Sequence, residues 1–127
     1  MANTAASPET VAVLGASPKP DRYAYRAMEM LREYGHHAIP VNPAFPEILG
    51  EKCYASIQDI PCKVGTATLY LGKERSGPLI AEILQANPRR IILNPGAENA
   101  DLATQAHAQG IEVVEGCTLV MLRSGTF

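Results

Sequence analysis

The sequence predicts an α/β protein with a three-layer, Rossmann-like fold. Short apolar segments alternate with segments of helical periodicity from Thr10 onward, a pattern typical of a parallel sheet covered by helices on both faces. The first apolar segment, 11–14, runs directly into Gly15 and then into a helix. Such a strand–turn–helix junction commonly opens this class of fold.

Five strands and three longer helices follow from this alternation. The strands are expected at 11–14, 37–41, 67–71, 90–93 and 111–114, and the helices at about 23–34, 76–86 and 98–109, with one helical turn within 55–60. The apolar positions of the first helix recur at the spacing of one helix face, at Ala24, Ala27, Met28 and Leu31. The buried face of the second is expected to consist of Leu79, Ile80, Ile83 and Leu84.

Right-handed crossovers leave few ways to order five parallel strands. We expect a mostly parallel sheet with the order 3-2-1-4-5, counted along the chain. Pro40 has no N–H to donate, so the regular pairing of the second strand is expected to fail near that residue. In such a sheet a ligand lies beyond the carboxyl ends of the strands, here at the switch point between strands one and four.

Size and composition favour one domain over residues 10–127, preceded by a flexible arm of residues 1–9. A net charge of −2, from 11 basic and 13 acidic side chains, favours neither nucleic acid nor a membrane surface as a partner. The N-terminus has no secretory signal pattern, and three cysteines at unrelated spacings indicate reduced thiols, so a cytoplasmic location is expected. The apolar segment 119–122 can pack on its own domain or on a second copy of the chain, as in a homodimer.

The loop after the first strand reads Gly15-Ala16-Ser17-Pro18 and indicates an anion site. Gly15 leaves room for phosphate to approach the backbone, the Ser17 hydroxyl is a donor, and the helix N-terminus favours negative charge. Candidate donors are the N–H groups of Gly15, Ala16, Ser17 and the segment from Asp21 to Tyr23. The competing interpretation is that Gly15 and Ser17 only build a turn and a helix cap. A valine at Gly15 is expected to block the ligand while the fold survives.

Basic side chains occur in three of the loops that follow strands: Lys19, Arg22, Lys52, Lys73 and Arg75. Arg22 is the preferred phosphate partner, because it stands at the start of the first helix, where a guanidinium can bind an oxyanion with two hydrogen bonds. Each of the others, taken singly, is interpreted as a solvated surface charge.

An NAD site is disfavoured by the same loops. The first loop is not G-x-G-x-x-G, and the second strand ends in Val41-Asn42-Pro43, without the carboxylate that binds the ribose hydroxyls of NAD. Asn42 can hydrogen-bond a ribose, but it does not replace that carboxylate. A phosphorylated nucleotide other than NAD is therefore expected.

Several short motifs together resemble the stand-alone CoA-binding domain family, which is related to the nucleotide-binding domain of succinyl-CoA synthetase alpha subunits. These motifs are Gly15-Ala16-Ser17-Pro18, Val41-Asn42-Pro43, Leu49-Gly50 followed by Tyr54, and Ile60-Pro61. The resemblance covers roughly residues 10–120. One departure is Leu71-Gly72, where members of the family often carry a Phe-Arg pair.

The resemblance implies a Rossmann-type domain that holds coenzyme A across the strand ends. Gly15 and Ser17 would meet the pyrophosphate, and Asn42 and Pro43 would border the adenosine portion. The adenine side would be lined by Leu71, Gly72 and Lys73. The pantetheine would pass the loop of Asn94, Pro95 and Gly96.

We find no catalytic constellation, which favours a binding protein over an enzyme. His36 and His37 are adjacent in an extended segment, so they face opposite ways and are poor joint metal ligands. Cys117 is interpreted as a structural thiol. Three hypotheses remain: non-catalytic binding of coenzyme A or an acyl-CoA, an NAD(P)-dependent oxidoreductase subunit, and an interaction module that has lost its ligand.

Overall fold

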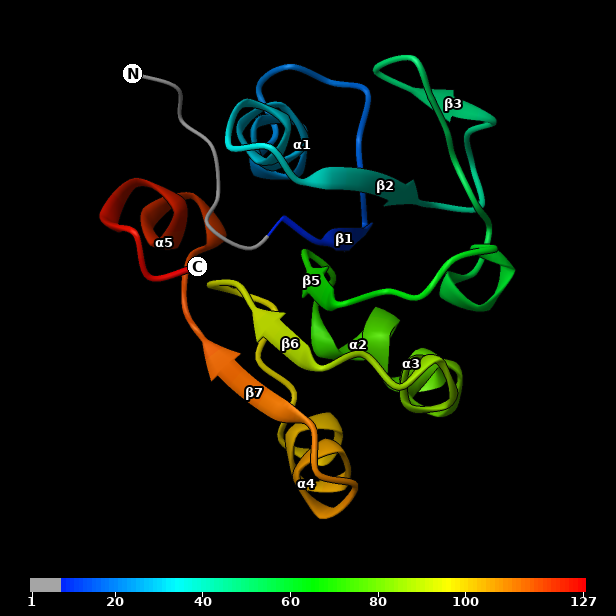
Figure 1. Ribbon diagram of the computed structural model, residues 1–127. Helices are drawn as coiled ribbons and strands as arrows, with labels where there is room; N and C mark the ends of the chain where they lie inside the picture. The colour runs from blue at the N-terminus through cyan, green and yellow to red at the C-terminus, as the bar shows by residue number, and fades with distance from the viewer. Residues whose placement is uncertain (1–7) are drawn as a thin grey trace.

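The computed structural model describes residues 8–127 (Figure 1). The main sheet contains five parallel strands: β1 (Thr10–Leu14), β2 (His37–Val41), β5 (Thr66–Leu69), β6 (Arg90–Leu93) and β7 (Glu112–Glu115). The helices are α1 (Tyr23–Glu33), α2 (Lys73–Ser76), α3 (Ile80–Ala86), α4 (Ala100–Ala108) and α5 (Thr118–Ser124). The expected α/β class with a parallel sheet and helices on both faces is confirmed.

The strand order is β2-β1-β5-β6-β7, which is 2-1-3-4-5 when the five strands are counted along the chain. The expected order 3-2-1-4-5 is therefore wrong, because the third strand lies between the first and the fourth. Both orders allow right-handed crossovers, so handedness alone does not separate them. The switch point moves accordingly, from between strands one and four to between β1 and β5.

Pro40 does not interrupt the pairing of β2, contrary to the sequence-based expectation. The register between β1 and β2 continues through the pairs Val13–Pro40 and Leu14–Val41. The carbonyl of Pro40 accepts a hydrogen bond from the N–H of Tyr54 on the side away from β1. In a parallel strand the N–H and C=O of one residue point to the same side, so an N–H at position 40 would also point away from β1. Its absence therefore removes no hydrogen bond of the main sheet, and proline is tolerated in this outer strand.

The two faces of the sheet are covered by different helices (Figure 1). α1 and α5 pack on one face, where Val11, Met28, Leu31 and Leu122 belong to one buried cluster. α3 and α4 cover the other face, where Leu69, Ile83, Ile91 and Leu102 are buried together. The apolar segment 119–122 thus packs partly on its own domain, while Val120 stays exposed.

The helix expected over 76–86 is broken into three pieces. α2 ends at Ser76, the 3-10 turn η2 covers Gly77–Leu79, and α3 begins at Ile80. Pro78 causes the break, since it has no N–H to donate and its ring crowds the preceding turn. The loop after β2 also differs from expectation, because it contains a short hairpin of β3 (Glu47–Ile48) and β4 (Glu51–Lys52). The helical turn expected within 55–60 is present as η1 (Ile57–Asp59).

An ionic cluster closes the amino-terminal edge of the sheet. Glu9 Oε2 lies 3.4 Å from Nη2 of the buried Arg90, and Glu9 Oε1 accepts a hydrogen bond of 2.6 Å from the hydroxyl of Thr66. The ring of Phe127 lies 4.3 Å from the guanidinium of Arg90 and 4.8 Å from the ring of His36. Of the arm expected at residues 1–9, residues 1–7 lie outside the described residues. Glu9 is held at the edge of the sheet by the contacts given above.

Candidate ligand groove

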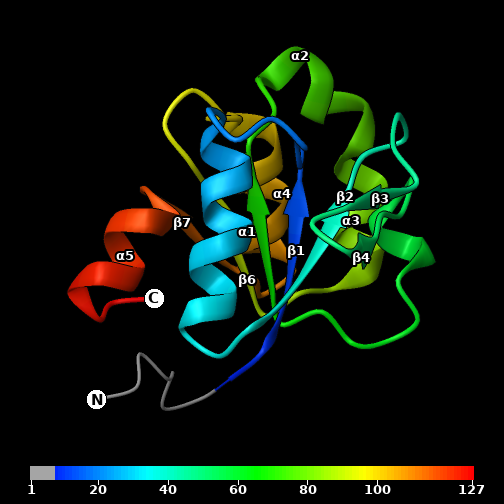
Figure 2. The same cartoon turned by 90° about the horizontal axis from the view of Figure 1, so that it is seen from above.

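The carboxyl ends of the strands converge on one edge of the sheet, where α1 begins and α2 lies (Figure 2). Two cavities meet at this edge, over the ends of β1 and β5. They share four lining residues, Gly15, Asn42, Leu71 and Arg75, and together they form what we call the groove. The groove coincides with the observed switch point of the sheet, which is the ordinary ligand position in open α/β sheets.

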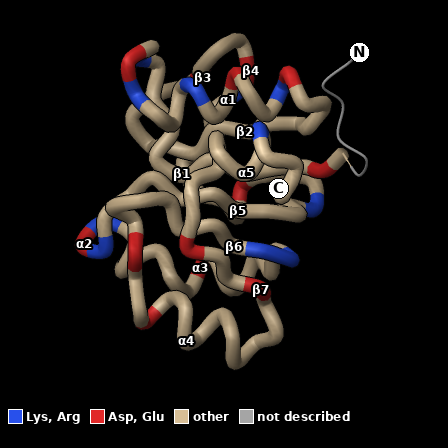
Figure 3. Tube along the Cα trace, turned by 90° about the vertical axis from the view of Figure 1, so that its left-hand side faces the viewer, with Lys and Arg blue, Asp and Glu red and all other residues tan. Residues whose placement is uncertain are grey.

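The larger cavity, of about 420 Å³, is lined by three cations and by no Asp or Glu of residues 8–127. We call it the cationic cavity. Its cations are Lys19, Arg22 and Arg75, and none of them forms an ion pair within residues 8–127. Figure 3 shows charges of both signs spread along the chain, so this concentration of cations is a local feature. Unpaired cations around a cavity favour an anionic ligand.

Gly15 holds the first loop in a conformation that an L side chain resists. Its φ is +85°, and a Cβ at this position would lie 3.0 Å from Leu71 Cδ2 and 3.2 Å from the backbone carbon of Tyr70. Its N–H donates to the carbonyl of Val41 at 3.1 Å and is therefore not free for a phosphate. The structural role of Gly15 is close packing of the loop against the chain that follows β5.

Other donors of the first loop remain available. The backbone N–H groups of Ser17 and Tyr23 have no hydrogen-bond partner among residues 8–127. The Ser17 hydroxyl oxygen accepts a hydrogen bond from the N–H of Lys19 at 3.1 Å, which leaves its own hydrogen free to donate. Ala16 is fully buried beneath the loop, so it contributes packing there.

Asn42 ties the loop after β1 to the loop after β2. Its Nδ2 donates to the carbonyl of Ala16 at 2.9 Å, and its Oδ1 accepts from the N–H of Ala44 at 2.8 Å. The N–H of Asn42 itself donates to Tyr54. Asn42 therefore positions the wall of the groove through both ends of its amide.

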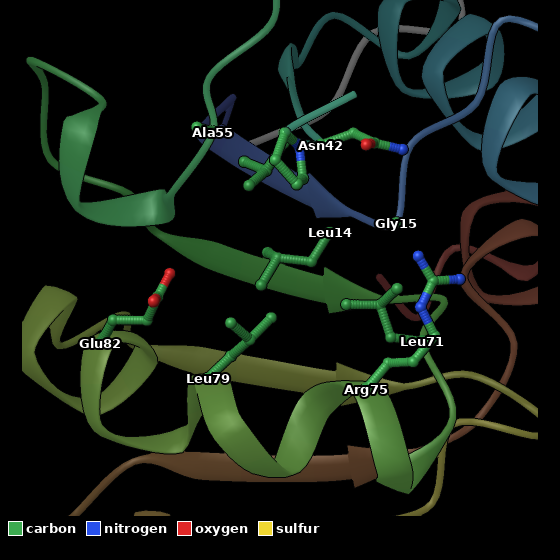
Figure 4. A pocket seen from close by; sticks show the side chains of 10 residues that line it. Leu14, Gly15, Asn42, Ala55, Leu71, Arg75, Leu79 and Glu82 are labelled. Atoms are coloured by element: carbon green, nitrogen blue, oxygen red, sulfur yellow. The ribbon is translucent and has the colours of Figure 1, made fainter. Parts of the chain in front are cut away.

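The smaller cavity, of about 310 Å³, has mostly apolar walls, and we call it the apolar cavity. Its apolar lining consists of Leu14, Val41, Pro43, Ala55, Leu71 and Leu79. Figure 4 shows the Arg75 guanidinium at one end of this cavity and the Glu82 carboxylate at the other, with Leu14 and Leu79 between them. Glu82 Oε2 accepts a hydrogen bond of 2.6 Å from the Ser56 hydroxyl.

The structure brings most of the expected site residues together, and three lie outside both cavities. Gly15, Ala16, Ser17, Arg22, Tyr23, Asn42, Leu71, Pro95 and Gly96 line the cationic cavity, and Pro43 lines the apolar one. Gly72 is the N-cap of α2, and Lys73 is exposed on that helix. Neither contributes to the lining of the two cavities.

Asn94 is also outside the cavities, because its side chain faces the interior. Its Nδ2 donates to Thr68 Oγ1 at 2.7 Å and to the carbonyl of Leu69 at 2.8 Å. Its Oδ1 accepts from the N–H of Thr118 at 2.9 Å. Asn94 thus joins the loop after β6 to β5 and to α5.

Sequence reasoning missed three residues that define the apolar cavity: Arg75, Leu79 and Glu82. They are separated by four and three residues, which is the spacing of one helix face. Leu79 is expected only as part of the buried face of a helix, and Arg75 only as one basic residue among several, so the sequence gives no reason to group them with Glu82.

Burial shifts the pKa values of two side chains near the groove. Tyr70 lines the cationic cavity, but its hydroxyl is buried without a partner among the described residues, and burial raises the pKa of Tyr70 to about 12. Burial also raises the pKa of the Cys53 thiol, which donates to the carbonyl of Asn42 at 3.3 Å. Both groups therefore stay protonated near neutral pH. Within residues 8–127, no three His, Cys, Asp or Glu side chains gather as a metal site would require.

None of the described helices has the length and apolarity that a membrane crossing requires.

A family model described as a CoA binding domain matches residues 9–123. The chain belongs to the CoA-binding domain family. Of the two motifs of this CoA-binding domain that carried most of the resemblance, all residues except Pro18 line adjoining walls of the groove: Gly15, Ala16, Ser17, Val41, Asn42 and Pro43. The family expected from the sequence is thus confirmed.

Solved structures share this fold over nearly the whole CoA-binding domain. A crystal structure of an uncharacterized protein is 40% identical, with a TM-score of 0.90, and the match covers 95% of this chain and 99% of that one. A hypothetical protein from Pyrococcus horikoshii OT3 is 29% identical, with a TM-score of 0.88, over 92% of this chain and 83% of that one.

Curated relatives include much longer proteins. The α subunit of acetate–CoA ligase (ADP-forming) II from Pyrococcus furiosus is 26% identical over 119 residues, which cover 85% of this chain and 26% of that one. Acetate–CoA ligase (ADP-forming) from Methanocaldococcus jannaschii is 34% identical over 64 residues, 50% of this chain and 9% of that one. The CoA-binding domain therefore matches only a small part of these ligases.

Proposed function

We propose that the chain binds coenzyme A or an acyl-CoA in the groove and catalyses no reaction with it. The observation that carries this proposal is the cationic cavity, whose described lining contains Lys19, Arg22 and Arg75 and no carboxylate. The pyrophosphate would lie there, against these cations and the free N–H groups of Ser17 and Tyr23. Membership of the CoA-binding domain family supports the same ligand.

The remaining parts of the ligand would extend in two directions from the pyrophosphate. The apolar cavity opens from the shared residues Gly15 and Leu71, and its walls suit the adenosine portion. Pro95 and Gly96 border the cationic cavity on its other side, where the pantetheine would leave. Asn42 would hold the loops around the adenosine in place without itself taking part in chemistry.

A non-catalytic role is supported by the side chains that line the groove. Among the residues the structure describes, Ser17 is the one serine, threonine or cysteine that lines the groove, and it contacts no general base. The Ser56 hydroxyl does contact the Glu82 carboxylate, but Ser56 lines neither cavity. Acyl transfer by a protein side chain requires an activated nucleophile. The relatives named as ligases are far longer than this chain, so their activity is not carried over to it.

Calorimetric titration with coenzyme A, acetyl-CoA, NAD and NADP tests this proposal. We expect coenzyme A and acetyl-CoA to bind with one site per chain and both dinucleotides to bind at least about tenfold more weakly, a difference of about 1.4 kcal/mol. Acetyl-CoA recovered after prolonged incubation should be chemically unchanged. Tighter binding of NAD or NADP would favour an oxidoreductase subunit, and no binding of any of the four would favour an interaction module.

Charge-removing variants locate the phosphate. Arg22→Gln and Arg75→Gln should each weaken coenzyme A binding about tenfold, since a charge-assisted hydrogen bond contributes about 1.5–3 kcal/mol. Arg123→Gln is the matched control, because Arg123 is exposed in the last turn of α5 and lines neither cavity. Equal effects of all three substitutions would contradict a phosphate site in the cationic cavity.

A further inference from the structure

Among the residues that the structure describes, Glu82 carries the one acidic group that lines the groove. Its carboxylate lies at the opposite end of the apolar cavity from the Arg75 guanidinium (Figure 4). One of its oxygens, Oε2, accepts the hydrogen bond from Ser56. The other, Oε1, has no hydrogen-bond partner among residues 8–127. An ionised carboxylate accepts hydrogen bonds and donates none. The best match for this end of the cavity is therefore a ligand that carries a hydrogen-bond donor there.

The positions of Arg75 and Glu82 fix the direction in which a nucleotide would lie. The two residues are seven apart along the segment of α2, η2 and α3, and Leu79 stands between them on the same side of that segment. Arg75 lines both cavities, whereas Glu82 lines only the apolar one. A nucleotide with its phosphates beside Arg75 would thus present its base to Leu79 and Glu82.

We propose that Glu82 accepts a hydrogen bond from the exocyclic amino group of an adenine ring, and that it makes the groove selective for adenine over hypoxanthine. The inference rests on the proposed function, because it assumes that a nucleotide occupies the groove. Hypoxanthine carries a carbonyl oxygen where adenine carries the amino group. Two acceptors would then face each other at Glu82. The neighbouring N1–H of hypoxanthine is displaced from the position of the adenine amino group, so it cannot replace that donor without a shift of the ring, which is costly in a cavity with apolar walls. Ser56 acts as a positioning residue through its hydrogen bond to Oε2.

Competition titrations with ADP and IDP test the selectivity. ADP should displace coenzyme A at a concentration at least about tenfold lower than the concentration of IDP that is needed. This is the difference expected for one charge-assisted hydrogen bond. In Glu82→Gln the preference should fall towards equality, because an amide offers both a donor and an acceptor. Ser56→Ala, a milder change, should reduce the preference partly. Glu29→Gln, on the exposed face of α1 and outside both cavities, should retain it in full.

A ligand without adenine separates recognition of the base from a general effect on the fold. 4′-Phosphopantetheine should bind wild-type protein and Glu82→Gln with equal affinity, whereas coenzyme A should bind the variant about tenfold more weakly. Equal competition by ADP and IDP in the wild type, or failure of both to compete, would overturn the role of Glu82 while coenzyme A binding stood. Loss of 4′-phosphopantetheine and coenzyme A binding together in Glu82→Gln would also overturn it. A wild-type protein that does not bind coenzyme A at all would instead refute the proposed function.

Discussion

The side-chain amide of Asn42 donates a hydrogen bond of 2.9 Å to the carbonyl oxygen of Ala16, so the end of β2 holds the loop that follows β1. The two segments are 26 residues apart in the chain and form adjoining walls of the groove. This contact explains why an amide stands at a position where an NAD site would carry a carboxylate. An aspartate could accept from Ala44, but it could not donate to Ala16.

Asn42→Asp should therefore weaken coenzyme A binding more than Asn42→Ala does. Both variants lose the donor to Ala16 and should lower the free energy of unfolding by about 1–2 kcal/mol, the ordinary cost of a lost, partly buried hydrogen bond. Only Asn42→Asp adds a negative charge beside the cationic cavity. Urea unfolding measures the first effect and calorimetric titration the second. Equal affinities of the two variants would contradict an anion in that cavity.

Gly15→Ala should destabilise the protein more than Gly50→Ala. Both glycines have positive φ values, +85° and +76°, so both variants carry the strain of an L residue in that region, about 1 kcal/mol. A Cβ at Gly50 would have no neighbour within 4 Å in the described part of the chain, whereas one at Gly15 would crowd Leu71 and the backbone of Tyr70. Urea unfolding of the two variants separates conformational strain from crowding.

Gly15→Val would add two methyl groups to that crowding. The structure therefore revises the expectation that this variant keeps its fold, and loss of ligand binding in it would not by itself locate the phosphate. Leu71→Ala alone should also destabilise the protein, because Leu71 is buried in the core. The double variant relieves the contact, so it should lose less stability than the sum of the losses in Gly15→Ala and Leu71→Ala. A loss equal to that sum would mean that the crowding is already absorbed by small shifts of the chain.

Glu9→Gln should destabilise the protein by about 3 kcal/mol, because it leaves the buried Arg90 guanidinium without a counter-charge. The amide of the variant can still accept from Thr66, so the loss reports mainly the charge. Replacing both members, Glu9→Gln with Arg90→Met, should restore much of the stability, and thermal and urea unfolding measure it. A double variant that is no more stable than Glu9→Gln would contradict this account.

The stability of the protein should fall as the pH drops below about 6.5, the ordinary pKa of histidine. Burial lowers the pKa of His36 in the folded state, against the opposing effect of the nearby Glu9, while Arg90 lowers it further. The Nδ1 atom of His36 accepts the N–H of Glu9 at 3.2 Å, a contact that protonation would remove. The unfolded chain binds a proton at His36 more readily than the folded chain does, so acid favours unfolding. The stability that neutral His36 contributes is fully present above about pH 6.5 and is lost as the pH falls below it.

His36→Gln should flatten the fall in stability below about pH 6.5, because it removes the group whose pKa differs between the two states. Urea unfolding of both proteins across this pH range gives the slopes. Gln105→Ala, on the exposed face of α4, is the control, because it removes no titratable group and should leave the slope unchanged. Equal slopes for wild type and His36→Gln would assign the acid sensitivity to other groups.

Much of the fold could be predicted from apolar periodicity, since the strands at 37–41 and 90–93 were placed as observed. The strand order could not be obtained that way, because two orders satisfy the same handedness rule. One residue did carry the missing information. Pro40 lacks a ladder N–H and belongs in an outer strand, whereas the expected order would have placed its strand between two others.

The site could be predicted in part for a similar reason. The loops after β1 and β2 are recognisable from Gly15, Ser17 and Asn42, because each of these residue types has a local effect on the backbone. The apolar cavity depends instead on Glu82, which meets Ser56 across 26 residues of sequence. No local rule pairs those two positions, and only the packing of α3 against the segment around η1 brings them together.

The three hydrogen bonds of Asn94 have a consequence for any shortened form of this protein. They link Asn94 to Thr68 and Leu69 of β5 and to Thr118 of α5, so the last helix is connected directly to the carboxyl end of β6, beside the groove. Trimming the chain before Thr118 would leave the Oδ1 acceptor of Asn94 without this partner, whereas the two hydrogen bonds that Nδ2 donates would remain. The carboxyl-terminal segment thus helps to position the loop after β6, which borders the groove.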